Sequence, residues 1–508
     1  STLGQEEDEE KKKCMSGTKG SSTPTKERKK EKNSTSTRHV QMDPLEVQQV
    51  PGAGDAAAAT GFIDAGMLIW IGFLQFKIAV DLGALSSLQC DFGQSTNPEC
   101  VLPDNFPALF FIFAIAFYPW IAFLTGKMHE LTVLFKALWV WILANFIAGF
   151  IGESHIMWWS RILVAYGGAA FITIAIPLIN DIAPATAKAR WMAVLPIALT
   201  AGGVTGFIYG RQADDDLPWL FRVEAFIMVP LSLLCFFPIF RLRLASIAAA
   251  KAAEEAAESS EGASKAAGGF MSNPLSLSSA KDMATSLKDA AEGATKTTGE
   301  YVQEMFANGA YVCTLLGNLT FYLSLGAFGM FIEEFLTANF DAPKEDAWIT
   351  TGALFLVAGL AGPLIAGIVL DYKTGSLKEN EGTPVSNLAT NSAKAAAFGA
   401  FVCGVCAIWT PDYSIALVLF ALSSILAFGC LVFVPIALVN IVDSKIKHWS
   451  VAFGYAACSL FQAALALWLV RCVRDAHGFE YGFTAGLSGF LLSGIFWSFA
   501  QTKEPEAQ

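Results

Sequence analysis

Charged residues are scarce in this chain of 508 residues, because Asp, Glu, Lys and Arg together make up only 16% of it. Soluble domains contain about 25%. The five histidines, at positions 39, 129, 155, 448 and 477, show no metal-ligand spacing. The sequence has neither an H-E-x-x-H pair nor a glycine-rich phosphate-binding loop, which argues against an intramembrane metalloprotease and an ATP-driven pump. We therefore expect a protein that is not an enzyme, with no metal, cofactor or nucleic-acid partner.

Long apolar runs are abundant. About a dozen runs of roughly 20 residues lie between Ala65 and Ala500, and 54% of the chain is hydrophobic. A hydrocarbon core about 30 Å thick requires about 20 apolar residues of helix, because backbone amides in lipid must bond within the helix. The sequence therefore predicts an all-α polytopic membrane protein with twelve transmembrane helices in two six-helix bundles. The expected spans are 63–84, 106–126, 131–151, 157–180, 190–210, 218–240, 306–330, 347–370, 393–410, 413–438, 449–470 and 481–500.

The positions of basic residues predict the orientation, since short cytoplasmic loops are enriched in Lys and Arg. The loops after the second, fourth, eighth and tenth spans carry Lys127, Lys188, Arg190, Lys373, Lys378, Lys445 and Lys447. Arg211, Arg471 and Arg474 are exceptions to this pattern. We expect both termini to be cytoplasmic. The expected segments are a disordered tail (1–60), an N-terminal bundle (61–241), a cytoplasmic central loop (242–305), a C-terminal bundle (306–501) and a short cytoplasmic tail (502–508).

Cysteine gives one further expectation. Cys90 and Cys100 both fall in the first non-cytoplasmic loop, where a disulfide and two free thiols are equally compatible with the sequence. Cys403 and Cys406 form a C-x-x-C inside an apolar run, where this spacing places two small core residues on one helix face.

An internal repeat divides the spans six and six. Pro119-Trp-Ile-Ala122 and Pro363-Leu-Ile-Ala366 lie 244 residues apart, and the expected first spans of the two halves differ by nearly the same offset. A shared offset indicates duplication. Two parallel six-helix halves around a midplane cavity are the architecture of major facilitator transporters.

Local motifs carry a resemblance to one family within that superfamily. Gly367-Ile-Val-Leu-Asp371-Tyr-Lys373-Thr-Gly375 resembles the superfamily's G-x-x-x-D-R-x-G loop. The fourth and fifth spans contain Arg161, Gly167-Gly168, Asp181-Ile-Ala-Pro184 and Arg190, followed by a glycine-rich stretch. Together with Asp81-Leu-Gly83, this arrangement is similar to the Spinster-like lipid transporters. The chain departs from that family at two positions. Leu82 stands where the family has Arg, and Gly168 stands where the family has Glu.

Several charged residues lie inside the expected spans, where each requires a partner or a water-filled cavity, and four of them are candidate site residues. Lys77 and Asp81 are four residues apart and share a helix face, so they can neutralise each other. Alternatively, Asp81 faces a central cavity and titrates or binds a positive group of the substrate. Arg161 can hold an anionic headgroup, favour ionised Asp81 or act as a static brace. Glu224 can balance Arg222 or a base in the pore.

A second group of residues is expected to act in conformational change. Asp371 ends the eighth span, where it can pair with basic groups or helix termini across the bundle interface, close to Lys373. Asp181 and Arg190 flank the loop between the fourth and fifth spans. Gly202 and Gly206 allow close helix packing, with bending during transport as a second role.

The sequence thus favours a monomeric secondary transporter in the lipid bilayer. Its expected substrate is a small amphiphilic or anionic organic solute, with lysophospholipids and sphingoid lipids favoured and H⁺ as the candidate coupling ion. Sugars, amino acids and other carboxylates are alternative substrates. A non-transporting receptor or scaffold that uses residues 242–305 is the alternative from a different class.

Overall fold

The computed structural model describes residues 53–87, 106–151, 154–212, 217–234, 298–377 and 384–501, and these ranges contain helices and no strand. The all-α prediction is confirmed. The helices are α1 (Ala53–Ser87), α2 (Phe106–Thr125), α3 (Glu130–Ile151), α4 (Ser154–Ile182), α5 (Lys188–Gln212), α6 (Leu217–Leu233), α9 (Thr298–Ala307), α10 (Gly309–Phe340), α11 (Lys344–Leu377), α12 (Val385–Ile408), α13 (Tyr413–Asn440), η1 (Ser444–Ile446), α14 (Lys447–Leu460), η2 (Phe461–Leu465), α15 (Ala466–His477) and α16 (Phe479–Ser498).

Eight of the described helices are long and apolar enough to cross a membrane. They lie in α1, α3, α4, α5, α10, α11, α12 and α13, and α2 contributes a shorter apolar stretch. Large hydrophobic side chains remain exposed on these helices, as expected where lipid replaces water as the solvent. Examples are Ile69, Leu143, Trp159, Leu364, Ile365 and Val418.

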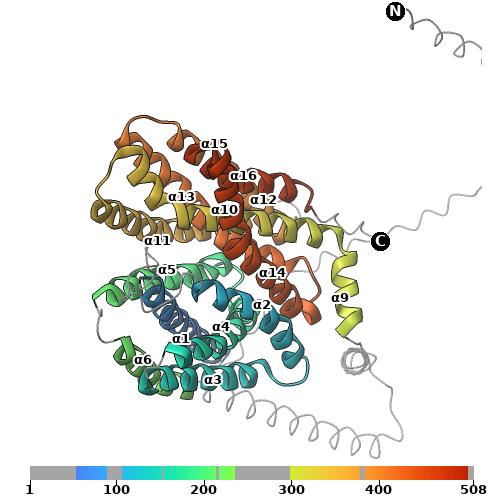
Figure 1. Ribbon diagram of the computed structural model, residues 1–508. Coiled ribbons are helices and arrows are strands. Elements are labelled where there is room, and N and C mark those ends of the chain that lie inside the picture. Colours follow the sequence, from blue (N-terminus) through green and yellow to red (C-terminus); the bar gives the residue numbers. More distant parts are fainter. Residues whose placement is uncertain are drawn as a thin grey trace, which may run out of the picture. The chain divides into compact units, whose positions relative to one another are not determined.

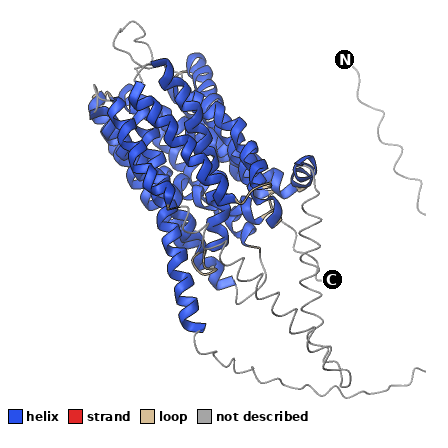
Figure 2. Cartoon of the chain, turned by 90° about the horizontal axis from the view of Figure 1, so that it is seen from below, coloured by secondary structure: helices blue, strands red, loops and turns tan. Residues whose placement is uncertain are grey.

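The helices form two groups within the compact unit that runs from Ala58 to Gln508. In the first group, α3 packs against α4 and α6, and α2 packs against α4. In the second, α12 packs against α13 and α16, and α10 packs against α16. The groups meet where α5 packs on α11 and α14 packs on α2 (Figure 1). Figure 2 shows the helices from a second direction, lying side by side along their lengths.

The first helix of each half is held by the same kind of contact. Leu82-Gly83-Ala84 in α1 recurs as Leu325-Gly326-Ala327 in α10, 243 positions later. A methyl group added at Gly83 would lie 2.0 Å from the backbone oxygen of Gly203, and one added at Gly326 would lie 2.5 Å from that of Gln462. Glycine is therefore needed at equivalent places in both halves, which adds structural support to the internal repeat.

The structure differs from the expected spans in detail. The expected span 449–470 is built from α14, the π-helical turn η2 and α15. A π-turn inside a helix has no simple sequence signature. The last part of the expected central loop is the amphipathic helix α9. Residues 1–52, 235–297 and 502–508, together with Cys90 and Cys100, lie outside the described residues.

Candidate substrate and gating site

A buried ion pair joins α1 and α4. The Asp81 carboxylate is fully buried, the Arg161 side chain is 2% exposed, and Arg161 NH1 donates to Asp81 Oδ1 at 2.8 Å. The structure therefore brings these two candidate residues together.

Arg161 has further partners that keep its guanidinium in place. Its NH2 group donates to Asn145 Oδ1 at 2.9 Å, and its Nε donates to Ser160 Oγ at 3.2 Å. The guanidinium also lies 4.4 Å from the ring centroid of Phe221 on α6. Three separate acceptors and an aromatic face suit the planar fork of Arg and could not be matched by an ammonium group.

Lys77 pairs with Glu224 and not with Asp81. Lys77 Nζ lies 3.6 Å from Glu224 Oε1, and both side chains are buried. The alternative in which Lys77 and Asp81 neutralise each other is wrong, because the Asp81 carboxylate pairs with Arg161. Arg222, the other expected partner of Glu224, donates instead to the Gly149 carbonyl at 2.6 Å.

Lys77, Asp81, Arg161 and Glu224 form the four-charge cluster. The groups that contact it among the described residues come from α1, α3, α4 and α6, so the first helix group supplies its walls. Whether Asp81 and Arg161 line a cavity between the two groups therefore stays a prediction. The cluster can bind protons or a charged solute group, because it contains two acids and two bases in a region shielded from water.

A second polar site joins the two helix groups. Asp371 near the end of α11 accepts hydrogen bonds from the backbone N–H of Ala189 at 2.8 Å and of Arg190 at 3.2 Å. Arg190 Nε donates to the same carboxylate at 2.8 Å. Asp371 therefore binds both a helix N-terminus and a basic side chain across the interface, as its position in the motif predicts. Lys373, two residues further along α11, donates to Ser392 on α12.

More contacts between the groups lie at the same helix ends. Lys447 at the start of α14 pairs with Asp181 at the end of α4. His448 Nε2 lies 3.1 Å from Glu130 Oε2, and its Nδ1 lies 3.2 Å from the Thr173 carbonyl oxygen. The contacts of Asp371 with α5, of Lys447 with Asp181 and of His448 with Glu130 are called the latch below.

A cavity of about 390 Å³ lies within the latch. Side chains from both groups line it, among them Asp181, Lys188, Asp371, Asn440 and Lys447. The amide of Asn440 bridges the groups here, since its Nδ2 donates to Asn180 Oδ1 at 3.1 Å.

Glycines bring α5 against α1 beside the four-charge cluster. A methyl group at Gly202 would lie 2.2 Å from the Phe76 carbonyl oxygen, and one at Gly206 would lie 2.0 Å from that of Val80. Both distances are too short for a real contact, so these positions require glycine. The predicted close packing is confirmed.

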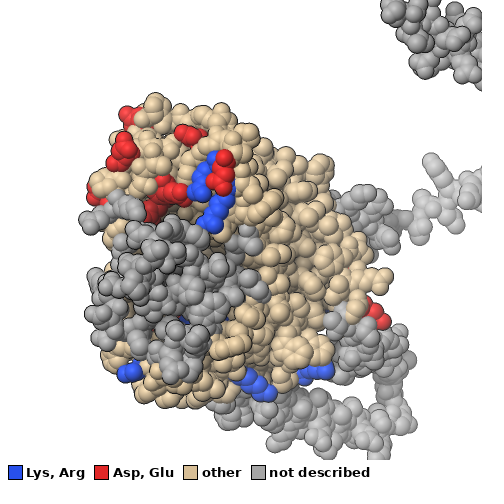
Figure 3. Space-filling view, viewed as in Figure 1, with Lys and Arg blue, Asp and Glu red and all other residues tan. Residues whose placement is uncertain are grey.

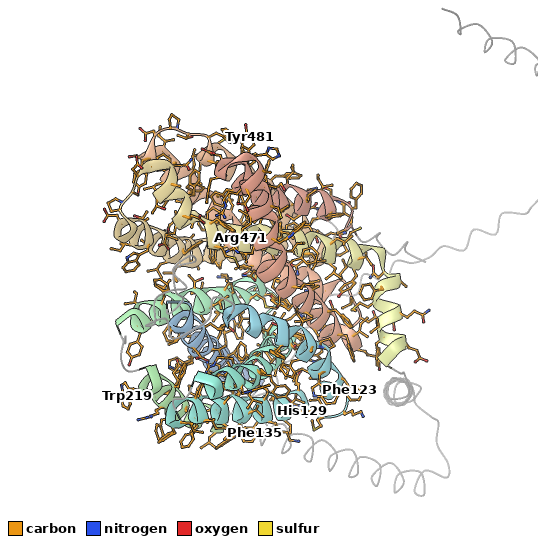
Figure 4. All side chains as sticks on the ribbon, in the orientation of Figure 1. Phe123, His129, Phe135, Trp219, Arg471 and Tyr481 are labelled. Carbon is orange, nitrogen blue, oxygen red and sulfur yellow. The ribbon has the colours of Figure 1, made fainter. Side chains whose placement is uncertain are left out.

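In the view of Figure 3, the charged side chains of the described residues form small groups among larger uncharged areas. In Figure 4, Phe123 and His129 mark the turn between α2 and α3, and Trp219 marks the first turn of α6. Trp219 is 54% exposed, which suits an amphipathic ring at a membrane boundary.

Sequence reasoning missed several partners. Asn145 stood out only as a polar residue in an apolar span, and that signal could have marked it as a partner for a buried charge. The sequence marks Lys447 only as a basic loop residue and His448 only as a histidine without metal-ligand spacing, and it gives Glu130 no distinguishing signal. No spacing in the sequence connects these residues, because their contacts cross from one half to the other.

Comparison with known proteins gives a family match. A family model described as Major Facilitator Superfamily matches residues 105–469. A probable sphingolipid transporter, spinster homolog 2 of Arabidopsis thaliana, is 23% identical over 400 residues, which cover 77% of this chain and 72% of the relative. A sphingosine-1-phosphate transporter of Mus musculus is 27% identical over 147 residues, which cover 28% of this chain and 26% of the relative.

Solved structures share the fold. The transporter FucP in its outward conformation aligns with a TM-score of 0.59 at 12% identity, covering 86% of this chain and 98% of that chain. A bacterial homologue of the human lysosomal transporter Spinster aligns with a TM-score of 0.50 at 13% identity, covering 86% and 96%.

Proposed function

The chain belongs to the major facilitator superfamily, and on this premise we propose that it moves a lysophospholipid or sphingoid lipid across a membrane by alternating access. The names of its relatives support this substrate class. An amphiphile with a charged headgroup also matches a buried site that holds two acids and two bases. The expected energy source is a gradient, with H⁺ as the coupling ion.

The observation that carries the proposal is the buried pair of Asp81 and Arg161. A charge at the bilayer centre costs at least about 2.5 kcal/mol on insertion scales, so a membrane protein rarely keeps four of them without a use. Arg161 can hold an anionic headgroup, and Asp81 can release Arg161 when the headgroup arrives.

The latch gives the proposal its second element. We expect its contacts to break when the cavity opens on that side and to re-form when the cavity opens on the other side. The pattern of basic loops supports a cytoplasmic position for the latch and for both termini. A monomer suffices for this cycle, since each chain contains both halves.

Uptake into proteoliposomes tests the proposal. The panel is radiolabelled sphingosine 1-phosphate, lysophosphatidylcholine, glucose and glutamate, with albumin extraction to remove lipid from the outer leaflet. We expect wild-type protein to protect one of the two lipids from extraction, and Asp81→Asn to abolish this protection. Asp412→Asn is the matched control, because Asp412 caps α13 and Asn caps a helix equally well. Retention equal to that of protein-free liposomes for all four solutes would refute transport of this class, and uptake of glucose or glutamate alone would refute the lipid substrate.

A further inference from the structure

Glu224 is the least compensated acid in the four-charge cluster. Its side chain is fully buried, and neither carboxylate oxygen accepts a hydrogen bond. Lys77 Nζ lies 3.6 Å from Oε1, within ion-pair range but beyond hydrogen-bonding distance. A buried carboxylate without hydrogen bonds depends on its counter-ion alone.

The other charged groups that act on Glu224 are Asp81 and Arg161. Arg161 does not bond to Glu224, since its three nitrogens donate to Asp81, Asn145 and Ser160. Arg222 on the same helix lies against Gly149 and Phe150. Among the described groups around Glu224, Lys77 is therefore the cation that can respond to a change in its charge.

Several buried polar atoms in and next to the cluster have no hydrogen-bond partner. Three of them are acceptors in the cluster, Asp81 Oδ2 and both oxygens of Glu224, and the neighbouring amide donor Asn145 Nδ2 is a fourth. Buried polar atoms nearly always find partners, so the two free oxygens of Glu224 are positions at which a proton can be bound. A proton adds a donor there without needing any additional volume.

We propose that Glu224 binds and releases the proton that drives the transport proposed above, and that Lys77 changes partner as it does so. A proton from water forms an O–H bond on one Glu224 oxygen, and no other bond is made or broken. The carboxyl becomes neutral and no longer compensates Lys77. Lys77 is then a buried cation on α1 that can bind an anionic headgroup. Binding of the anionic solute is therefore coupled to protonation of Glu224. Loss of the proton restores the Lys77–Glu224 pair and displaces the solute.

Infrared spectroscopy of the full-length protein in liposomes tests the proton site without any solute. The readout is the C=O stretching band of a protonated carboxyl group, identified by its shift in D₂O, across about pH 4 to pH 9, a range that spans the values of ordinary and buried carboxyls. We expect wild-type protein to show a buried-carboxyl band that disappears as the pH rises. The band should be lost in Glu224→Gln and kept in the matched control Glu304→Gln, because Glu304 is exposed on α9.

A second variant keeps the test decisive if Glu224→Gln does not fold. Lys77→Gln retains Glu224 but removes its counter-ion, so the midpoint of the band should shift to higher pH by about one unit or more. Absence of a titrating band in the wild type, persistence of the same band in Glu224→Gln or an unchanged midpoint in Lys77→Gln would each overturn the inference. Failure of the uptake panel would instead refute the proposed function, because the infrared titration requires no transport.

Discussion

At the scale of single residues, Arg161 makes the largest number of contacts in the four-charge cluster. It lies on α4 with its side chain almost fully buried, where a lone guanidinium would be costly. Its three nitrogens reach a carboxylate, an amide oxygen and a hydroxyl, and Phe221 covers its face. The same contacts fix Arg161 beside Asp81, where we propose that a headgroup binds.

Arg161→Lys should abolish lipid transport. Lysine keeps the charge but cannot reach Asp81, Asn145 and Ser160 at once, because an ammonium is a point charge without a planar fork. Breaking up a buried charge network of this kind costs about 3–5 kcal/mol. Transport of radiolabelled sphingosine 1-phosphate and the thermal unfolding midpoint are the two measurements.

Arg222→Lys is the control for this prediction. In the described part of the chain, Arg222 donates to the Gly149 carbonyl and lies over the Phe150 ring, and a lysine can supply both a donor and a cation there. We expect its transport rate to stay near that of the wild type. Wild-type rates in Arg161→Lys would show that the fork of hydrogen bonds is not required.

At the scale of secondary-structure elements, α1 and α5 approach each other closely enough to bring backbone into contact with backbone. Gly206 faces the Val80 carbonyl and Gly202 faces the Phe76 carbonyl, and these two residues directly precede Asp81 and Lys77. Lys77 and Asp81 are therefore positioned by glycines on a different helix. A displacement of α5 would move both charges.

Gly206→Ala should destabilise the protein and slow transport. The added methyl would lie 2.0 Å from the Val80 oxygen, so α1 and α5 must separate. Overpacking of this kind costs about 1–3 kcal/mol. Gly203→Ala is a matched control on the same helix, because nothing lies within 4 Å of its added methyl. Equal unfolding midpoints for the two variants would contradict the account of this interface.

Asp371→Asn should loosen the latch. Asparagine offers one oxygen in place of two and no charge, so the hydrogen bonds from Ala189, Arg190 and the Arg190 side chain cannot all be kept. Hydrogen bonds to a charged group contribute about 1.5–3 kcal/mol each. We expect a cysteine placed at Ala185, which lines the latch cavity, to react faster with a water-soluble maleimide in this variant.

The latch experiment uses a background without the native cysteines, and Asp412→Asn serves as its control. Asp412 caps α13, outside the latch, and should leave the labelling rate unchanged. A labelling rate in Asp371→Asn equal to that in the parent would show that Asp371 does not hold the latch closed.

At the scale of the whole molecule, the fold was predictable and most of the site partners were not. Apolar runs near 20 residues and the repeated Pro-x-Ile-Ala motif were sufficient for two groups of helices, because lipid imposes helix length. Asp81 and Arg161 could be selected because charge is rare in such runs. Helix spacing favoured Asp81 as the partner of Lys77, because residues four apart share a face. In the structure Lys77 pairs with Glu224 on α6 and Asp81 pairs with Arg161 on α4. Contacts such as Lys447 with Asp181 depend on how the halves meet, which no local pattern encodes.

Membrane topology gives a prediction for the complete chain. Epitope tags inserted at residue 260 and at residue 505 should both be accessible from the cytoplasm, because six spans are expected between them. Antibody labelling of cells before and after selective permeabilisation of the plasma membrane measures this. Tags on opposite sides would refute an even number of spans between the two positions.

Movement of the two helix groups at the latch is the most direct test of alternating access. Ala185, in the turn between α4 and α5, and Thr374 on α11 both line the latch cavity. Spin labels at these two positions report the distance between the helix groups by double electron–electron resonance in lipid nanodiscs. The account predicts two distance populations, with the shorter one matching the closed latch described above. Addition of sphingosine 1-phosphate should change their ratio in the wild type but not in Asp81→Asn. A single distance that responds to neither the lipid nor Asp371→Asn would contradict the account.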